Sequence, residues 1–203
     1  MRLHAIFALG FTAAMAFGAS ASASPITSAP PALYVNGNVK LVYIGGDAGD
    51  RSVLSMTDGP ANVFCNKSGA SCTATAPGTI VDLGSHTGVL NFTLANTTVT
   101  SVFDTANTAA DGYYHARITA DYADLGIFSM PEGAATVIDS LLDTAHIVYY
   151  IGFEDRMHGD YDYNDFVFAL IDPPIAGVPE PLTISLLGAG LLGLGFSRHK
   201  ARA

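Results

Sequence analysis

Short runs of β-branched and aromatic residues, separated by Gly, Asn, Asp and Ser, recur through the middle of this chain. Such runs favour strands because branched and aromatic side chains pack well on a pleated surface, and the separating residues favour turns. The predicted strands are residues 39–44, 79–83, 89–94, 98–103, 113–120, 147–153 and 166–171. Several short strands at close spacing predict an all-β fold, an antiparallel β-sandwich of the jelly-roll or immunoglobulin-like type.

Two of these runs, residues 147–153 and 166–171, are apolar at consecutive positions rather than at alternate ones. A strand of this kind needs cover on both faces, so we expect both strands in the middle of a sheet. One short helix is predicted over residues 134–142, where apolar residues follow helical spacing.

Proline marks the edges of the predicted domain. Residues 24–32 and 172–177 are Pro-rich, and segments of this composition adopt extended conformations that act as semi-rigid spacers. They predict one β-sandwich domain over residues 33–171 between two linkers. The whole chain of 203 residues is long enough for one such domain with appendages.

The charge balance of the chain is acidic. The sequence has 9 Lys and Arg against 18 Asp and Glu, a net charge of −9, and four of the basic residues lie at the two ends of the chain. The predicted domain is therefore more acidic than the chain as a whole. A surface of this sign repels phosphate groups, so nucleic acid is not expected as a partner.

The N-terminal residues are typical of a secretory signal peptide. Arg2 supplies a short basic region, residues 5–17 are mostly apolar, and residues 19–23 contain two Ala-x-Ala cleavage patterns. The apolar stretch is brief for a membrane span, and the alternative is a buried core helix. We expect residues 1–23 to direct export through the Sec translocon and then to be removed.

The C-terminal segment, residues 178–203, has three parts: a Pro-Glu-Pro motif, an apolar Gly- and Leu-rich stretch over about 182–197, and a basic end. The apolar stretch has no polar face, and the cations beside it would stay cytoplasmic, so it is predicted to cross a membrane as a helix. It is short for a hydrocarbon core of about 30 Å, a mismatch that snorkelling or local thinning accommodates. The motif and basic residues are Pro179, Glu180, Pro181, Arg198, Lys200 and Arg202.

These three parts, in this order, resemble the PEP-CTERM sorting signal of Gram-negative bacteria. The resemblance implies recognition by an exosortase, a membrane-embedded transpeptidase that cuts near the Pro-Glu-Pro motif and releases the body of the protein to the cell surface. It also implies transient anchoring in the inner membrane and an association with exopolysaccharide and biofilm formation. The alternative is an ordinary C-terminal anchor that is never cleaved.

The two cysteines, Cys65 and Cys72, are predicted to form a disulfide. An isolated pair at this spacing in an exported protein most often does so. Closing so short a loop lowers the entropy of the unfolded chain, which stabilises the folded protein by about 2.5 kcal/mol. A metal site would need further ligands, and a catalytic thiol would need a paired histidine.

An acidic loop is predicted between the last two strands, over residues 154–165. Like charges so close together repel unless a cation neutralises them, and calcium, which takes oxygen ligands, is available outside the cell. The candidate calcium ligands are Glu154, Asp155, Asp160, Asp162, Asn164 and Asp165.

The spacing of these ligands excludes an EF-hand, because the sixth and twelfth positions of such a loop would be Asp165 and Ile171. An extended backbone would hold alternate side chains about 6.6 Å apart, so a calcium site requires the segment to curl, with Glu154 or Asp155 closing it. The alternative is a solvated turn in which Asp and Asn side chains bond to their own backbone.

The loop also resembles a domain of unknown function found in bacterial surface proteins. The resemblance rests on Phe-Glu-Asp at 153–155 and on Asp-x-Asp-x-Asn-Asp-Phe at 160–166, with Tyr163 where the family usually has Phe. It implies a β-sandwich and calcium, but no established activity. A Gly- and Ala-rich turn after residue 44 fits the family loosely, and places Asp47 and Asp50 as neighbours of the acidic loop.

These observations predict a structural protein of the cell surface or extracellular matrix that calcium stabilises, and they do not predict an enzyme. The main alternative is a carbohydrate-binding module for exopolysaccharide, in which Tyr161 and Tyr163 stack on sugar rings. A glycoside hydrolase, with Glu154 and Asp160 or Asp162 as paired carboxylates, is less favoured because the chain has no Trp for a sugar platform. The histidines, including His115 and His158, are expected to be surface or strand residues.

Overall fold

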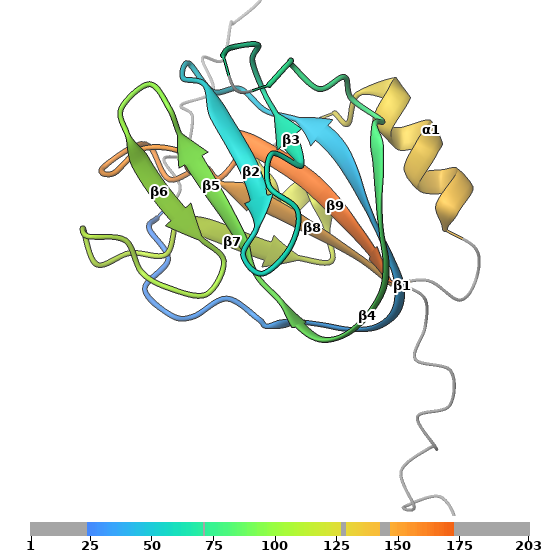
Figure 1. Ribbon diagram of the computed structural model, residues 1–203. Helices are drawn as coiled ribbons and strands as arrows, with labels where there is room; N and C mark the ends of the chain where they lie inside the picture. Colours follow the sequence, from blue (N-terminus) through green and yellow to red (C-terminus); the bar gives the residue numbers. More distant parts are fainter. Residues whose placement is uncertain (1–23, 71, 127–128, 143–146, 173–203) are drawn as a thin grey trace, which may run out of the picture.

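The computed structural model describes residues 24–70, 72–126, 129–142 and 147–172 (Figure 1). The predicted signal peptide, residues 1–23, and the predicted sorting signal, residues 178–203, lie outside the described residues. So does all of the second linker except Asp172. Within the described part of the chain, no helix has the length and apolarity that a membrane crossing needs.

The first of two sheets has five strands in the order β4-β1-β9-β8-β7, all antiparallel to their neighbours. It pairs the first strand of the chain with the last, which joins both ends of the domain in one sheet. The strands are β1 (Leu33–Gly45), β4 (Ile80–Leu90), β7 (Ala116–Thr119), β8 (Ile147–Phe153) and β9 (Phe166–Asp172).

The second sheet has four strands in the order β3-β2-β5-β6, again all antiparallel. Its strands are β2 (Ser52–Met56), β3 (Phe64–Cys65), β5 (Phe92–Asn96) and β6 (Ser101–Asp104). This sheet lies in front of the five-stranded sheet in Figure 1. The main hydrophobic core contains side chains from both sheets, so the domain is all-β and sandwich-like.

Alternation along the strands explains how this core forms. Leu33, Val35, Val39 and Leu41 of β1 are all fully or almost fully buried and belong to the main core. They occupy alternate positions, apart from the register shift after Val39. Burying an aliphatic or aromatic side chain of this size stabilises the fold by about 1.5–3 kcal/mol.

The last two strands lie inside the five-stranded sheet, as predicted from their apolar pattern. In β9, Phe166, Phe168 and Leu170 face the core between the sheets, and Val167 and Ala169 belong to a second cluster on the opposite face. That opposite face is covered by α1 (Glu132–Leu141) and by η1 (Tyr122–Leu125), a short 3-10 helix. The predicted helix over residues 134–142 is therefore confirmed, with its start two residues earlier.

The disulfide between Cys65 and Cys72 is confirmed. Cys65 is buried in β3, opposite Val53 of β2. The bond ties the loop after β3 to the edge of the four-stranded sheet.

Several strand boundaries differ from the sequence expectation. The strands β2 and β3 were not predicted, because neither run is long enough to stand out from the Ser- and Gly-rich residues around it. The strand predicted over 98–103 begins only at Ser101, since the Asn96 side chain accepts bonds from the backbone N–H groups of Thr98 and Val99 and forms a turn there.

Part of the N-terminal Pro-rich segment is held against the domain. Ile26 pairs with Tyr114 as an isolated β-bridge, and the Ile26 N–H donates to the Tyr163 hydroxyl at 2.8 Å. Residues around Ile26 are therefore an extension of the fold rather than only a spacer.

Candidate functional site

The acidic loop connects β8 to β9, two strands that pair along their whole length up to Phe153 and Phe166. Residues 154–165 therefore leave and re-enter the sheet at neighbouring points. The backbone is coiled rather than extended, because His158, Tyr161 and Tyr163 all have positive φ angles, between 57° and 60°. These left-handed residues supply the curl that a cation site in this segment requires.

The curl gathers the five carboxylates of the loop into two adjoining groups. Glu154, Asp155 and Asp165 each offer a carboxylate oxygen within 4.8 Å of the others, and so do Glu154, Asp160 and Asp162. Glu154 belongs to both groups and lies at their junction. Either group could hold a metal ion.

Asn164, the one candidate ligand that is not a carboxylate, is bonded to Asp162. Its side-chain amide donates to Asp162 Oδ2 at 2.6 Å, and its backbone N–H donates to Asp162 Oδ1 at 3.2 Å. In this structure the Asn164 side chain therefore orients Asp162, and its amide oxygen has no part in these two bonds.

Glu154 is the most constrained of the carboxylates, with 2% of its surface exposed. Its two oxygens accept from the backbone N–H groups of Tyr161, at 2.9 Å, and of Arg156, at 3.3 Å. A side chain at Gly159 would overlap the Glu154 carboxylate, which would then have to shift. Burial, and then the nearby Asp165 carboxylate, raise the pKa of Glu154 to about 8.

Asp155 is equally buried, with 2% of its surface exposed. The Ser52 hydroxyl on β2 donates to Asp155 Oδ2 at 2.9 Å, and the Asp155 N–H donates to Asp165 Oδ2 at 3.0 Å. Burial and then the Asp165 charge raise the pKa of Asp155 to about 6. Two carboxylates with raised pKa values at one place indicate a site that favours added positive charge.

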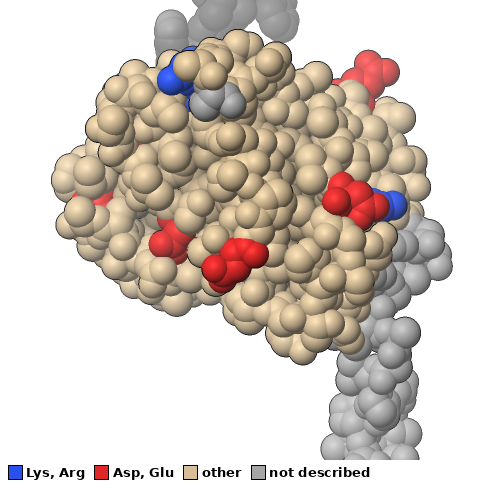
Figure 2. All heavy atoms as spheres, viewed as in Figure 1, with Lys and Arg blue, Asp and Glu red and all other residues tan. Residues whose placement is uncertain are grey.

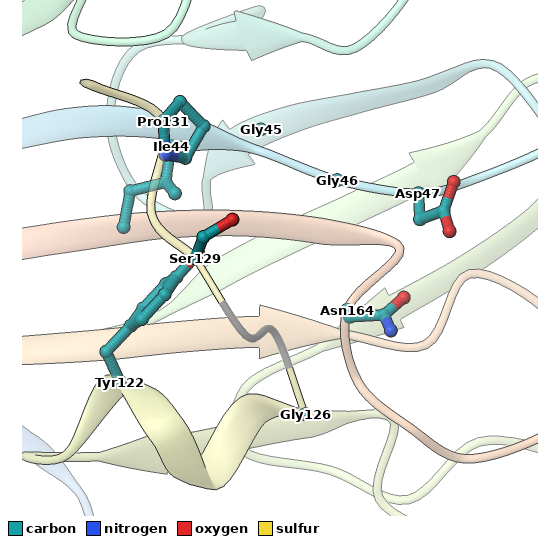
Figure 3. Close-up of a pocket in the computed structure, with 9 residues that line it drawn as sticks. All are labelled: Ile44, Gly45, Gly46, Asp47, Tyr122, Gly126, Ser129, Pro131 and Asn164. Carbon is teal, nitrogen blue, oxygen red and sulfur yellow. The ribbon is translucent and has the colours of Figure 1, made fainter. Parts of the chain in front are cut away.

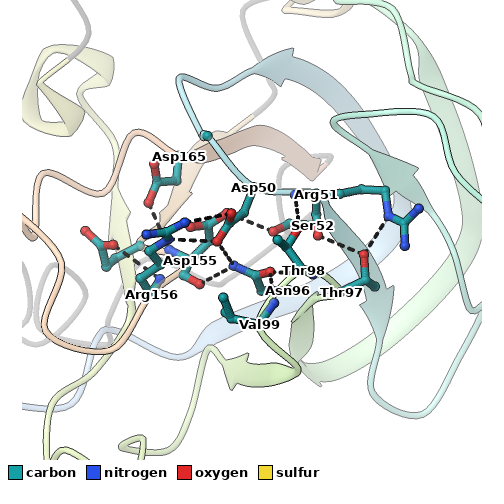
Figure 4. A network of polar contacts seen from close by, with 12 residues as sticks. Asp50, Arg51, Ser52, Asn96, Thr97, Thr98, Val99, Asp155, Arg156 and Asp165 are labelled. Carbon is teal, nitrogen blue, oxygen red and sulfur yellow. Dashed lines mark hydrogen bonds and ion pairs between the residues drawn. The ribbon is translucent and has the colours of Figure 1, made fainter.

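A buried polar network joins the acidic loop to the four-stranded sheet (Figure 4). The side-chain amide of Asn96, at the end of β5, donates to Asp50 Oδ2 and to the Asp155 carbonyl, both at 2.8 Å. Arg156 donates two bonds to the Asp50 carboxylate, at 2.7 and 2.8 Å. The hydrogen bonds from Arg156 and Asn96 lower the pKa of Asp50 to about 2.

The network confirms that the turn after β1 lies beside the acidic loop. The Asp47 N–H donates to the Asn164 carbonyl at 3.0 Å, and Asp50 binds Arg156. Ser52 and Asn96, in contrast, were not expected as parts of the site. Nothing in their spacing relates them to residues 154–165, because the contact arises only when the two sheets pack.

His115, expected as a surface or strand residue, is buried just before β7 and is also part of this region. Its side chain is fully buried and pairs with the buried Asp111 carboxylate at 3.0 Å. The other ring nitrogen lies 3.2 Å from the Glu154 carbonyl, and the ring stacks on Phe103 with centroids 4.2 Å apart. His115 therefore contacts the backbone at the start of the acidic loop and links it to Asp111.

The two tyrosines predicted to bind sugar differ in their surroundings. Tyr163 is fully buried, its hydroxyl donates to the Tyr114 carbonyl at 3.1 Å, and the Arg117 guanidinium lies 4.7 Å from the centre of its ring. Its ring is therefore not available for stacking on a sugar. Tyr161 is half-buried and packs edge-to-face against Tyr113.

Charged side chains are sparse on the face of the described residues that Figure 2 shows, and the acidic ones stand apart from one another. The basic side chains on this face form only small separate areas. On this face the described acidic side chains therefore do not form a broad acidic surface.

No family model matches this chain, and neither does any curated protein or solved structure.

Proposed function

We propose that this chain is an exported structural protein of the bacterial cell surface or extracellular matrix, whose domain is stabilised by calcium bound at the acidic loop. The sandwich would be of the jelly-roll or immunoglobulin-like type. Export would use the signal peptide, and an exosortase would process the C-terminal sorting signal. The sequence pattern at the two chain ends supports the export part of the proposal.

One observation carries the cation part: Glu154 lies at the junction of two carboxylate groups, and it and Asp155 are almost fully buried. Burying a charge without a partner is costly, and Arg156 directs its two strong bonds away from the group to Asp50. A divalent cation would supply the missing positive charge. Calcium fits best, because the donors are all oxygens and because it accepts irregular geometry.

The carbohydrate-binding alternative has less support at the position first considered for it. The buried Tyr163 cannot contribute a stacking face, and Tyr161 packs edge-to-face on Tyr113 with its hydroxyl 3.5 Å from Asp111. A hydrolase is also less favoured. The carboxylate oxygens of Glu154, Asp160 and Asp162 lie within 4.8 Å of one another, too close for an inverting enzyme, whose carboxyl groups are about 6.5–9.5 Å apart to admit a water. A retaining enzyme, with about 5–5.5 Å between its carboxyl groups, needs a pair that substrate can reach, and Glu154 is 2% exposed.

The export part is tested by the intact mass of the protein recovered from its host, fraction by fraction. We expect the extracellular or surface fraction to contain a chain that has lost residues 1–23 and the segment that follows the Pro-Glu-Pro motif. Full-length chain recovered only from the cytosol would overturn the export proposal. Recovery from the inner membrane with the C-terminus intact would overturn exosortase processing.

A further inference from the structure

A pocket of about 430 Å³ lies on the outer side of the five-stranded sheet, between the end of β1, η1, the start of α1 and the acidic loop. This volume is within the range of small-molecule sites, and it is well above that of a gap left by imperfect packing. The pocket is separate from the carboxylate groups, since none of their five acidic residues lines it.

The two ends of the pocket differ in chemistry (Figure 3). Ile44, Tyr122 and Pro131 form an apolar end, where the Tyr122 side chain reaches from η1 toward Ser129. Asp47 and Asn164 stand together at the opposite end. A ligand that fills this pocket therefore needs an apolar face at one side and hydrogen-bonding groups at the other.

The polar end is held in a fixed arrangement. The Asp47 N–H donates to the Asn164 carbonyl at 3.0 Å, and the Asn164 amide donates to Asp162. Gly46 lies so close to the Asp165 carbonyl that a side chain there would overlap it. Asn164 keeps its side-chain carbonyl oxygen as an acceptor and a second N–H as a donor, while the Asp47 carboxylate adds acceptors only.

The apolar end carries an unpaired polar atom. Among the residues that the structure describes, the Tyr122 hydroxyl is the buried side-chain group without a hydrogen-bond partner. Buried hydroxyl groups are normally paired. Tyr122 lines the pocket, and its hydroxyl has almost no accessible surface in the structure. The Tyr122 ring itself packs edge-to-face on Tyr150, which fixes its position.

From this arrangement we infer that the pocket binds a neutral sugar ring. One face of a pyranose is apolar and fits against an aromatic ring and proline, and its hydroxyl groups both donate and accept, as Asn164 and Asp47 require. An anionic ligand would be repelled by Asp47 and the neighbouring acidic loop. A cationic ligand would use the carboxylate but leave the Asn164 N–H without an acceptor.

This site is distinct from the loop tyrosines considered above, and it depends neither on the bound cation nor on export. The test is ligand-observed NMR titration of the purified protein with the neutral methyl glycosides of glucose, galactose and mannose. Glucuronate and glucosamine serve as charged probes of similar size. Each titration is run in calcium and again in chelator. The pocket inference predicts sugar binding in both conditions, so it can be judged whether or not the cation proposal holds.

We expect saturable binding of at least one neutral glycoside, weakened about tenfold or more by Asp47→Ala and by Tyr122→Leu. Asp47 is exposed, so its replacement leaves the fold intact if Tyr122→Leu proves unstable. Ser129→Trp, which fills the pocket, should also abolish binding. Tyr161→Ala is the matched control on the acidic loop and should bind as the unmodified protein does.

Three results would overturn the inference: absence of saturable binding by every neutral glycoside, binding that Asp47→Ala and Ser129→Trp leave unchanged, or preferential binding of a charged probe. The first would leave the pocket without this ligand class, the second would place sugar binding elsewhere on the chain, and the third would assign the pocket to a different ligand class.

Discussion

At the scale of single residues, the group of carboxylates in the acidic loop could be predicted from the sequence, whereas the residues that hydrogen-bond to it could not. The five carboxylates are close in sequence, so any compact loop brings them together. Ser52 and Asn96 come from strands far away in the chain, and they meet Asp155 only after the two sheets pack. The burial of His115 could not be predicted for the same reason, since its contact with the Glu154 carbonyl is long-range.

The replacement Asn96→Ala should lower the free energy of unfolding by about 2–3 kcal/mol. The Asn96 side chain bonds to Asp50, to the Asp155 carbonyl and to two backbone N–H groups in the turn after β5, and each of these bonds would be lost. Asp50 alone keeps other side-chain bonds, the two from Arg156. Urea unfolding measures the change. Asn38→Ala, at an exposed position of β1, is the control and should change stability by no more than about 0.5 kcal/mol. Equal effects of the two replacements would show that the network does not support the loop.

In the presence of a chelator, the free energy of unfolding should fall as the pH rises from about 4.5 to about 8. The pKa of Glu154 is raised from an ordinary 4.5 to about 8, so over this range the folded chain keeps a proton that the unfolded chain has released. The Asp50 carboxylate makes the free energy of unfolding rise with pH instead, but only at lower pH. Its pKa is lowered from 3.8 to about 2, so its stabilising effect is present above pH 3.8 and is lost as the pH falls through 2.

Calcium should flatten this dependence, because a bound cation favours the ionised carboxylates and releases the proton. Unfolding free energies measured across this pH range, with chelator and with calcium, provide the comparison. A chelated protein whose stability is constant or rises between pH 5 and pH 8 would contradict the burial of an uncompensated Glu154.

At the scale of elements, strands with a clear pattern could be predicted and irregular ones could not. The central position of β9 follows from its apolar side chains on both faces, and the helix α1 follows from its spacing. The short strands β2 and β3 lack such a pattern, and their pairing depends on neighbours distant in the chain. Similarly, the acidic loop could be located, but its coiled backbone depends on left-handed conformations at His158, Tyr161 and Tyr163, which their residue types do not indicate.

Gly46→Ala should destabilise the junction between β1 and the acidic loop by about 1–3 kcal/mol. The new methyl group would overlap the backbone carbonyl of Asp165, which cannot move without disturbing the start of β9. Gly49→Ala, in the same turn, is a matched control, because a methyl group there meets nothing within 4 Å. Chemical unfolding of both variants tests the expectation, and a Gly46→Ala protein as stable as Gly49→Ala would disprove the close contact.

At the scale of the whole molecule, the acidic loop connects the two sheets. It belongs to the β8–β9 hairpin of the five-stranded sheet, and through Asp155 and Arg156 it contacts Ser52, Asn96 and Asp50, which lie in or beside the four-stranded sheet. A cation bound to Glu154 and its neighbours would therefore stabilise the packing of one sheet on the other. An ion that binds only the folded chain raises its stability by mass action.

Thermal unfolding in calcium and in chelator tests this claim most directly. With calcium in hundredfold excess over its dissociation constant, the midpoint should rise by about 5 °C or more above that in chelator. Glu154→Gln should remove the difference, and Asp58→Asn, which removes a charge from an exposed turn, should keep it. Superimposable unfolding curves of the unmodified protein in calcium and in chelator would contradict the account.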